Sequence, residues 1–273
     1  MTTFERRRRL LELLHKEPGL RVPEVAGLLG VSQGTIRNDL KALADDKQLI
    51  RVRGGAAVPV ENIQPRNSSF TTRTHLNEEA KQLIGRTAAA LVEDGDAILL
   101  DASTTVFQMS QYLQDRRNLR VVTNGIEVAR FLAQNPTNMV ILVGGILHSE
   151  TESVTGPWSE RFIQDVCTKI AFISCSGFTA EGGMTDVNIY EAQFRKKAID
   201  STSRVIALID SSKFGKMDLA PSIQIDKLSQ IYTDPAISLG WVARLEQAGV
   251  AFTICDGGEK HEPVDNPSNN ISR

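Results

Sequence analysis

The sequence predicts an α/β protein with two domains: an N-terminal winged helix-turn-helix over residues 1–60 and a doubly wound α/β domain over residues 78–255. The first prediction rests on three short helical patterns followed by a glycine-centred hairpin pattern. The second rests on short apolar runs that alternate with helical patterns, which is typical of βα units and a mostly parallel sheet. Residues 61–77 are polar and aperiodic and are expected to be a linker, and residues 256–273, with almost no apolar content, are expected to be disordered.

Charge is distributed unevenly along a chain whose composition is otherwise typical of a packed protein. Of its 273 residues, 41% are hydrophobic and 23% are charged. The net charge is −2, but residues 1–59 hold eleven Lys or Arg against seven Asp or Glu, which leaves +4 there and −6 for the remainder. A cationic end segment suits a polyanionic partner.

The three cysteines, Cys167, Cys175 and Cys255, show no metal-ligand spacing and are expected to be buried thiols in a reducing cytoplasm. No run approaches the roughly 20 apolar residues that a membrane span needs, so no membrane association is expected. The sequence also contains no phosphate-binding loop motif and no cluster of metal ligands. We therefore expect neither a cofactor nor a metal.

The N-terminal elements follow from apolar spacing and from helix-ending residues. Apolar residues at helical spacing predict a helix over about residues 3–16 and a second short helix that stops at Gly30, where left-handed backbone is easily accommodated. Ser32 is expected to cap a third helix, because Ile36 and the apolar residues after it recur at helical spacing. Residues 49–60 then contain two short extended stretches around a glycine pair, which predicts a hairpin or wing.

One face of the predicted third helix is polar and points away from its apolar stripe. A helix in the major groove uses such a face, since Arg can pair with guanine and Asn or Gln with adenine. Arg51 and Arg53 on the wing, together with the arginines at 6–9, would contact phosphates. The alternative is the solvated face of a small helical interaction module. The residues expected to contact double-stranded operator DNA are Ser32, Gln33, Gly34, Thr35, Arg37, Asn38, Lys41, Arg51 and Arg53.

Three N-terminal segments carry a resemblance to a known family. "RRRLLELL", "VPEVAGLLGVSQGTIRNDLKAL" and "LIRVRGGA" resemble the winged helix-turn-helix signature of the DeoR family of bacterial transcriptional repressors. That family often has arginine where this chain has Asn38, so the resemblance leaves the operator sequence open.

In the larger domain, three turns after predicted strands are rich in small polar residues: "DASTT", "TNG" and "GG". In a doubly wound sheet such turns lie at the C-terminal edge of the strands, where ligands bind, so they are expected to line one pocket. The hydroxyls and amides at the start of the helix after "DASTT" suit a phosphate, although they also fit an ordinary helix cap. The pocket residues expected from these turns are Asp101, Ser103, Thr104, Thr105, Thr123, Asn124, Gly125, Gly144 and Gly145.

Two charged residues are candidates for the same pocket. Lys213, in "LIDSSKFGK", would neutralise a bound phosphate, or it is an ordinary surface lysine. Glu191 follows a glycine-rich turn and lies on a predicted helix, where it would accept hydrogen bonds from sugar hydroxyls or carry a helix-surface charge.

The same segments extend the resemblance over about residues 4–255. "DASTT", "VVTNGIEVA", "LVGGIL", "GFTAEGGMT", "EAQFRKKAI" and "DSSKFGK" are similar to the DeoR-type C-terminal sensor domain. The resemblance implies a domain of the ribose-5-phosphate isomerase/CoA-transferase-like type that binds a phosphorylated sugar, usually in a homo-oligomer, here a dimer or tetramer. The chain departs from the family pattern at "ISCSGF" and at Gln193, which bears on the sugar-facing side of the pocket.

The residues and the resemblance together predict a ligand-responsive repressor of a carbohydrate catabolic operon, and two other functions compete with this prediction. A sugar-phosphate isomerase-like enzyme with a fused DNA-binding domain needs an acid/base set, yet the turn at residues 174–183 offers Glu181 as its only charge. Cys175 as a nucleophile lacks a histidine nearby in sequence. A large domain that only oligomerises would keep the DNA-binding prediction and drop the effector.

Overall fold

The computed structural model forms two compact units, residues Met1–Arg66 and Asn67–Arg273, and each is described by itself. The structure describes residues 3–16, 22–45, 50–52, 55–57 and 69–257. Most of the expected linker and the expected disordered tail after residue 257 lie outside these ranges. The predicted domain boundaries therefore stay a prediction.

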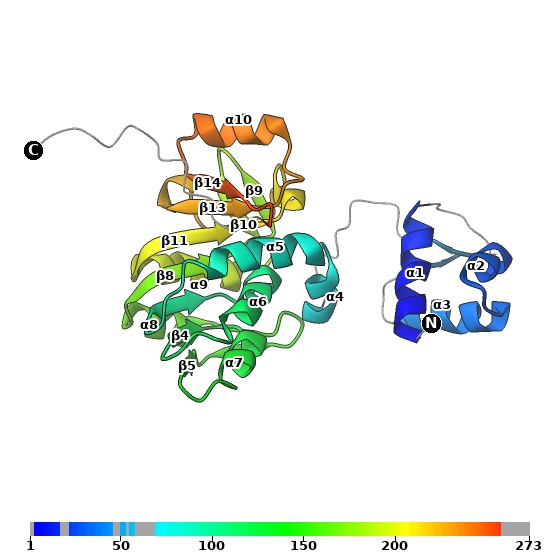
Figure 1. Ribbon diagram of the computed structural model, residues 1–273, viewed down its shortest axis with the longest axis horizontal. Coiled ribbons are helices and arrows are strands. Elements are labelled where there is room, and N and C mark those ends of the chain that lie inside the picture. The colour runs from blue at the N-terminus through cyan, green and yellow to red at the C-terminus, as the bar shows by residue number, and fades with distance from the viewer. Residues whose placement is uncertain (1–2, 17–21, 46–49, 53–54, 58–68, 258–273) are drawn as a thin grey trace, which may run out of the picture. The chain divides into compact units, whose positions relative to one another are not determined.

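The N-terminal unit contains the expected three helices and hairpin. Helices α1 (Thr3–Lys16), α2 (Val22–Leu29) and α3 (Gln33–Asp45) precede strands β1 (Ile50–Val52) and β2 (Gly55–Ala57), which pair antiparallel. Gly30 has φ +66°, a left-handed conformation that glycine adopts without strain, and it separates α2 from α3. The observed order confirms the helix-turn-helix with a wing (Figure 1).

A small apolar core and one ion-pair cluster hold this unit together. Leu10, Val25 and Ile36 are buried in one cluster to which each of the three helices contributes. Behind it, Arg6 Nε donates to Asp39 Oδ2 at 2.6 Å and Arg7 Nε donates to Oδ1 at 3.0 Å. These two arginines hold α1 to α3, which gives Arg6 and Arg7 a structural role. The phosphate contacts expected for residues 6–9 stay a prediction.

The larger unit is built on a seven-stranded parallel sheet, as expected. Its strand order is β14-β13-β11-β8-β3-β4-β5, and every neighbouring pair is parallel. The chain runs outward from β3 on one side and, after crossing back, outward from β8 on the other. The bounds of these strands are β3 (Ala97–Leu100), β4 (Arg120–Thr123), β5 (Met139–Leu142), β8 (Thr168–Ile173), β11 (Thr202–Leu208), β13 (Gln230–Thr233) and β14 (Phe252–Ile254).

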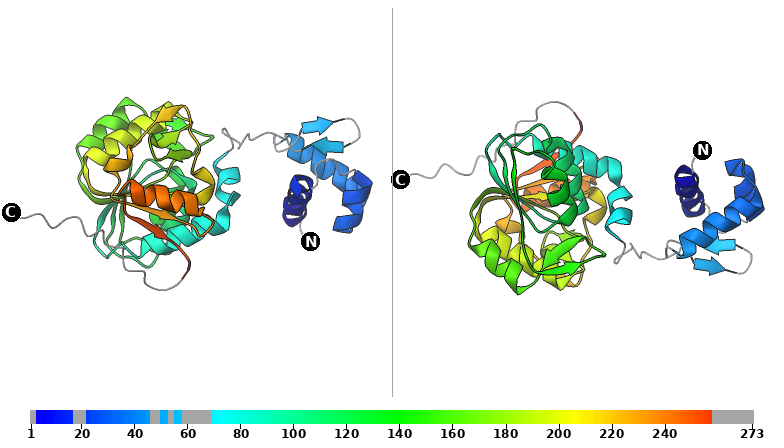
Figure 2. Two further views of the ribbon diagram at one scale, coloured as in Figure 1. Left: turned by 90° about the horizontal axis from the view of Figure 1, so that it is seen from above. Right: turned by 90° about the horizontal axis from the view of Figure 1, so that it is seen from below.

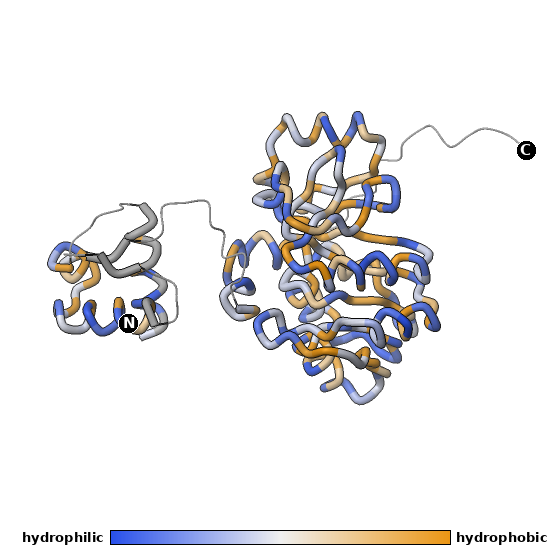
Figure 3. The backbone as a smooth tube through the Cα atoms, turned by 180° about the vertical axis from the view of Figure 1, so that it is seen from behind, coloured by the Kyte–Doolittle hydropathy of each residue, from blue (hydrophilic) through white to orange (hydrophobic). Residues whose placement is uncertain are grey.

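Helices cover both faces of this sheet (Figures 1 and 2). Alternate residues of one strand belong to different cores: Leu99 of β3 packs on one face, and Ile98 and Leu100 pack on the other. Hydrophobic segments lie in the interior of this unit in Figure 3. The first face is covered by α8 (Pro157–Gln164), α9 (Ile189–Asp200) and α10 (Leu239–Gln247), and the second by α5 (Glu78–Ala89), α6 (Thr104–Ser110) and α7 (Ile126–Leu132).

Two small antiparallel sheets were not expected from the sequence. The glycine-rich stretch expected as a turn before a helix is a hairpin, because β9 (Gly177–Thr179) and β10 (Gly183–Asp186) pair there and β12 (Ala220–Pro221) joins β10. Strands β6 (Ile146–His148) and β7 (Ser153–Thr155) form a second pair. The described part of the unit also contains the 3₁₀ turns η1 (Gln111–Leu113), η2 (Ser211–Lys213) and η3 (Ile225–Lys227).

Two sequence expectations are wrong in this unit. Part of the stretch expected as linker forms helix α4 (Phe70–His75), because Phe70 is buried against Phe107 with ring centroids 5.4 Å apart and Ser69 caps the helix. Cys167 is exposed, whereas Cys175 and Cys255 are buried as expected. No helix within the described ranges is long and apolar enough to cross a membrane.

Asp39→Ala is expected to lower the unfolding free energy of the N-terminal unit by about 1 to 3 kcal/mol, because it removes the acceptor of two charged donors. Burial alone would raise the pKa of Asp39, but the hydrogen bonds from Arg6 and Arg7 outweigh it and lower that pKa. The contribution is therefore present at neutral pH and lost as the pH falls through the lowered pKa. Denaturation of wild type and variant at pH 7 and near pH 3 measures this, and an equal difference at both values would contradict it.

Candidate functional site

The polar face predicted on the third helix is exposed in the structure. Ile36 is fully buried, whereas Arg37, Asn38 and Lys41 are exposed on the opposite side of α3. At the helix start, Ser32 Oγ accepts a hydrogen bond from the Thr35 backbone N at 3.1 Å, which is the expected cap. Gln33 and Gly34 are exposed beside it, so five of the expected DNA-contacting residues share one solvent-facing surface.

The wing residues are described less fully. Arg51 lies on β1, in register with Ala56 of β2, and its side chain is not described. Arg53 lies outside the described residues. Their phosphate contacts stay a prediction, as do the base contacts of α3.

The second candidate site lies where the sheet reverses its strand order, between β3 and β8. Ligands of doubly wound sheets bind at this point, outside the carboxyl ends of the strands. Asp101 directly follows β3 and Ser174 directly follows β8. The Ser174 backbone N donates to Asp101 Oδ2 at 3.0 Å, so these two strand ends meet through the Asp101 carboxylate.

Asp101 is buried and accepts two further hydrogen bonds. The Ser103 backbone N donates to Oδ1 at 2.9 Å, and Arg195 Nε donates to Oδ2 at 2.8 Å. These bonds hold the loop before α6 and connect it to α9. The expected pocket residue Asp101 is therefore a positioning residue whose carboxylate is engaged by the protein itself.

Arg195 gathers three carboxylates around one buried guanidinium. Besides Asp101 it pairs with Asp186 at 2.8 Å and with Glu191 at 3.6 Å. Burial would lower the pKa of Arg195, because it disfavours the charged form. The three carboxylates outweigh this effect and raise the pKa. Burial also raises the pKa of Asp186, because it outweighs the attraction of Arg195. We call Asp101, Asp186, Glu191 and Arg195 the arginine cluster.

Glu191 joins this cluster to the β6–β7 hairpin. Its Oε1 accepts from Ser153 Oγ at 3.0 Å, and Ser153 is fully buried. From the sequence, Glu191 could be either a pocket residue or a charge on the helix surface. Its side chain is buried inside the unit, so it is not a surface charge.

Lys213, in the 3₁₀ turn η2 after β11, also contacts Ser174. Its Nζ donates to Ser174 Oγ at 2.9 Å and pairs with Asp210 Oδ2 at 3.3 Å, and only 15% of its side chain is exposed. Asp210 also accepts from Asn77 Nδ2 at 3.1 Å. Burial would raise the pKa of Asp210, but Lys213, Ser212 and Lys81 together lower it.

The "TNG" turn lies beside the loop that follows β3. A Cβ on Gly125 would lie 2.9 Å from the Ala102 Cα, so only glycine permits this approach of the two turns. Thr123 Oγ1 accepts from the Gly125 backbone N at 3.0 Å. Asn124 is buried, and its Oδ1 has no hydrogen-bond partner among the described residues.

The other expected residues divide into two groups. Thr104 and Thr105 are buried at the start of α6, and Thr105 Oγ1 lacks a partner within the described part of the chain. Gly144 and Gly145 instead pack towards β7 and α8, since Ser159 Oγ donates to the Gly144 carbonyl at 2.7 Å. The structure thus connects Asp101, Ser103, Glu191 and Lys213 by direct contacts through Ser174 and Arg195, and shows no such link for the glycine pair.

Three cations at this edge were not predicted as site residues: Arg73, Lys81 and Arg195. Arg195 follows Glu191 by four positions on one helix, a spacing that places both side chains on the same face and would have identified the pair. Arg73 gave no such signal, because α4 itself was expected to be linker, and Lys81 lies on α5 with no sequence feature that marks it. Lys81 is 4% exposed, and its Nζ donates to the backbone carbonyl of Arg73.

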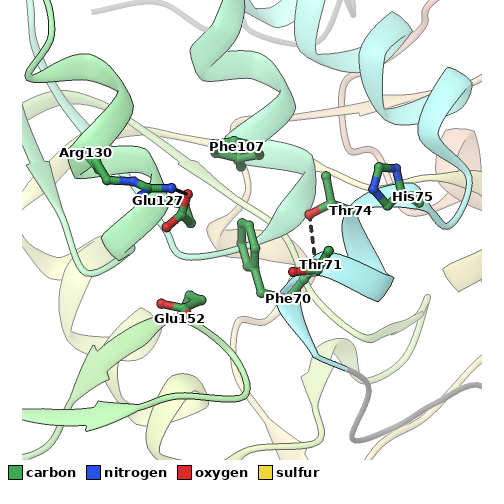
Figure 4. A pocket seen from close by; sticks show the side chains of 8 residues that line it. All are labelled: Phe70, Thr71, Thr74, His75, Phe107, Glu127, Arg130 and Glu152. Carbon is green, nitrogen blue, oxygen red and sulfur yellow. Dashed lines mark hydrogen bonds and ion pairs between the residues drawn. The ribbon is translucent and has the colours of Figure 1, made fainter. Parts of the chain in front are cut away.

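A shallow pocket of about 280 Å³ lies beside α4 and shares no residue with the sites above. Phe70 and Phe107 are the apolar residues that line it, and Glu127 and Arg130, which also line it, pair with each other (Figure 4). In this pocket the charges of Glu127 and Arg130 neutralise each other, and none of the lining residues has a buried polar atom without a hydrogen-bond partner. The buried charges at the switch point of the sheet are therefore the stronger indication of a ligand site.

Cys175 is buried in the apolar core. Burial raises the pKa of its thiol to about 12, so the thiol is protonated at neutral pH. Glu181, the charge that the isomerase alternative would use, is exposed on the β9–β10 turn. Neither residue forms part of the arginine cluster.

A three-helix unit with an exposed polar recognition face and a hairpin, joined to an α/β unit with buried charges at its switch point, defines a DNA-binding regulator with a ligand-sensing domain. The chain belongs to the DeoR family: residues 6–62 match the DeoR-like helix-turn-helix domain, and residues 76–235 match the DeoR C terminal sensor domain. It is a transcriptional regulator, and the relatives found are regulators rather than enzymes.

Two relatives span nearly the whole chain. The HTH-type transcriptional regulator GolR of Listeria innocua is 32% identical over 94% of this chain and 100% of its own length. The glycerol-3-phosphate regulon repressor of Escherichia coli is 28% identical over 93% of this chain and 100% of its own length. Ribose 5-phosphate isomerase A of Neisseria gonorrhoeae is similar at 14% identity and a TM-score of 0.37, over 53% of this chain and 55% of that one, which is too low to bear on function.

Lys81→Met is expected to stabilise the sensor unit by about 1 to 2 kcal/mol at pH 6 and by less at pH 9. Burial and the nearby Lys213 lower the pKa of Lys81 from 10.5 to about 7; Asp210 and Glu78 act in the opposite direction, and Arg73 adds to the lowering. Below pH 7 the folded protein bears the full cost of burying this charge. Between pH 7 and 10.5 the folded state loses the proton that the unfolded state keeps, so the cost shrinks.

Denaturation of wild type and Lys81→Met at both pH values measures this difference. The matched control is Lys196→Met, which removes the same charge from an exposed position on α9. A gain that is larger at pH 9 than at pH 6 would contradict the assigned burial cost.

Proposed function

We propose that this chain represses a carbohydrate catabolic operon and releases its operator when a phosphorylated sugar binds at the β3–β8 switch point. The observation that carries the proposal is the meeting of Lys213, the start of α6 and the arginine cluster at one strand edge. Lysine and helix-start amides suit a phosphate, and carboxylates suit sugar hydroxyls.

The printed names of the relatives support this choice of ligand and operon. One is a glycerol-3-phosphate regulon repressor, and another, from Escherichia coli O157:H7, is a putative aga operon transcriptional repressor, 27% identical over 92% of this chain and 94% of its own length. We carry over from these names only the class of effector, a small phosphorylated carbohydrate or polyol.

The regulator is proposed to act in the cytoplasm as a dimer or tetramer. A single small winged module buries too little DNA surface for high specificity, so paired modules on repeated half-sites are expected. Effector binding would shift the population of the oligomer away from the arrangement that fits those half-sites.

Arg37→Ala is expected to weaken operator binding by about 1 to 3 kcal/mol and to relax base preference at one position of each half-site, because an exposed α3 side chain can pair with a base edge. Mobility-shift titrations against the operator and its single-base variants measure both effects. Lys227→Ala, an exposed lysine of the sensor unit, is the control. Uniform weakening across all base variants would assign Arg37 to phosphate contact instead.

Lys213→Ala is expected to reduce the response to the effector by tenfold or more, about 1.4 kcal/mol of coupling, because it removes a cation from the proposed phosphate site. The measurement is operator affinity with and without a panel of sugar phosphates and their free sugars. Lys196→Ala serves as the control for loss of one positive charge. Equal release by a free sugar and by its phosphate would sink the phosphate assignment, and turnover of the ligand would favour the isomerase.

A further inference from the structure

Five large hydrophobic side chains are exposed on one surface of the sensor unit. They lie on β6, on the first two turns of α8 and on the first turn of α9, and α8 and α9 pack against each other. Trp158 is 78% exposed, and the other four are between 36% and 54% exposed. We call this surface the apolar face. Its residues are Ile146, Trp158, Phe162, Ile189 and Tyr190.

Strand β6 connects the parts of the apolar face. A Cβ on Gly156, the residue before α8, would lie 3.3 Å from the Ile146 Cδ1, so Ile146 lies at the start of α8. His148 lies on the same side of β6 as Ile146, two residues further on. Its ring stacks on the Tyr190 ring at the start of α9, with centroids 5.9 Å apart. The apolar face is therefore continuous from one helix start to the other.

The two aromatic residues of α8 do not hold this helix on the sheet. Trp158 and Phe162 are four positions apart, so they share one side of the helix, and both are exposed. The next residue after each, Ser159 and Ile163, is fully buried and anchors α8. A single exposed hydrophobic residue needs no explanation, whereas a contiguous group of them marks an interaction surface.

The size of the apolar face matches one half of a homodimer interface. At about 200 Å² for a large side chain, the exposed fractions amount to roughly 500 Å² of side-chain surface. A standard interface covers about 800 Å² on each partner, and about 65% of a homodimer interface is apolar, which is again roughly 500 Å². The apolar face is therefore large enough for a stable dimer.

The charges beside the apolar face suit a second copy of the same chain. Arg161 and Asp165 follow Trp158 and Phe162 by three positions on α8, so they lie beside them, and both are exposed. Neither is in an ion pair with another residue that the structure describes. Across a two-fold axis a surface meets itself, so a rim with one positive and one negative side chain can pair reciprocally with its copy. A partner of one charge sign would match only one of them.

We propose that the apolar face is the contact between two copies of this chain related by a two-fold axis, with Trp158 as its main anchor. The proposal rests on the function proposed above for the need to pair two DNA-binding modules, and it adds the surface that pairs them.

The apolar face and the arginine cluster share structural elements. Tyr190 is exposed on the first turn of α9, and the next residue, Glu191, is buried and accepts a hydrogen bond from Ser153 of β7. Strand β7 in turn pairs with β6, which carries Ile146. A second copy on the outer side of this hairpin and helix turn therefore rests on the elements that hold the cluster on their inner side.

The test is sedimentation equilibrium of the full-length protein at micromolar concentrations. Wild type is expected to sediment as a dimer or a tetramer. Trp158→Lys and, as a second variant, Ile189→Lys are expected to halve this mass or to weaken self-association by about tenfold or more, because each places a charge in the interface. The matched control is Tyr112→Lys, which changes an exposed aromatic residue of η1 on the other face of the sheet and is expected to keep the wild-type mass.

Fluorescence reports on Trp158 directly. The chain has two tryptophans, so Trp158 is the only one left in Trp241→Phe. Acrylamide quenching of its emission is expected to fall as this variant associates, because an exposed ring becomes buried. Thermal unfolding shows that each lysine variant is folded before its mass is interpreted.

The remaining outcomes contradict the proposal or separate it from the proposed function. A wild type that stays monomeric, lysine variants that both keep the wild-type mass, or quenching that does not change on association would each overturn it. A halved mass in Leu239→Lys in place of these variants would put the interface on α10. In all these cases release of operator by a sugar phosphate would still support the proposed function. Halved masses without release by any sugar phosphate would leave the interface standing and remove the proposed function.

Discussion

The buried carboxylate of Asp101 is the interaction on which the sensor unit's ligand edge depends. It accepts hydrogen bonds from the backbones of Ser103 and Ser174 and from the Arg195 side chain, so it joins the ends of β3 and β8 to α9 at the point where the strand order reverses. A carboxylate at this depth is stable only with such donors, and removing one partner would leave a buried charge uncompensated. The same hydrogen bonds orient the loop before α6. The Asp101 carboxylate therefore shapes the site, while its oxygens are already engaged by the protein.

The charges around Asp101 divide the edge into two halves of different chemistry. On one side Arg195 holds Asp186 and Glu191, and Glu191 in turn holds Ser153 of β7. On the other side, the carboxylate of Asp210 lies near two cations, Lys213 and Lys81, so the positive charge there is not fully neutralised. A ligand with a hydroxylated part and an anionic part matches this division. Burying Lys81 costs stability at neutral pH, and a residue retained at such a cost is expected to serve binding.

The sequence predicted the parallel sheet, the helix-turn-helix and most strand-end turns because periodicity and turn residues report local structure directly. Helix α4 was missed because its six residues are polar except for Phe70, and their order comes from long-range packing on Phe107 and Glu150. The antiparallel hairpins were missed because their strands are only three or four residues long. Asp101 and Lys213 were predicted from strand ends and are linked in the structure through Ser174, whereas Arg73 could not be found without α4.

The two units differ in how exposed their cations are. Among the described residues of the DNA-binding unit, Arg37 and Lys41 are exposed, whereas Arg6 and Arg7 pair with Asp39. The sensor unit buries Lys81 and Arg195 and leaves Arg73 partly exposed, and the low dielectric around such groups makes each contact strong and each unpaired charge costly. Exposed cations suit a large polyanionic partner such as DNA. Buried cations suit a small anion that loses its water and is held in one orientation, and the free energy of that exchange is what an effector can contribute to a change of state.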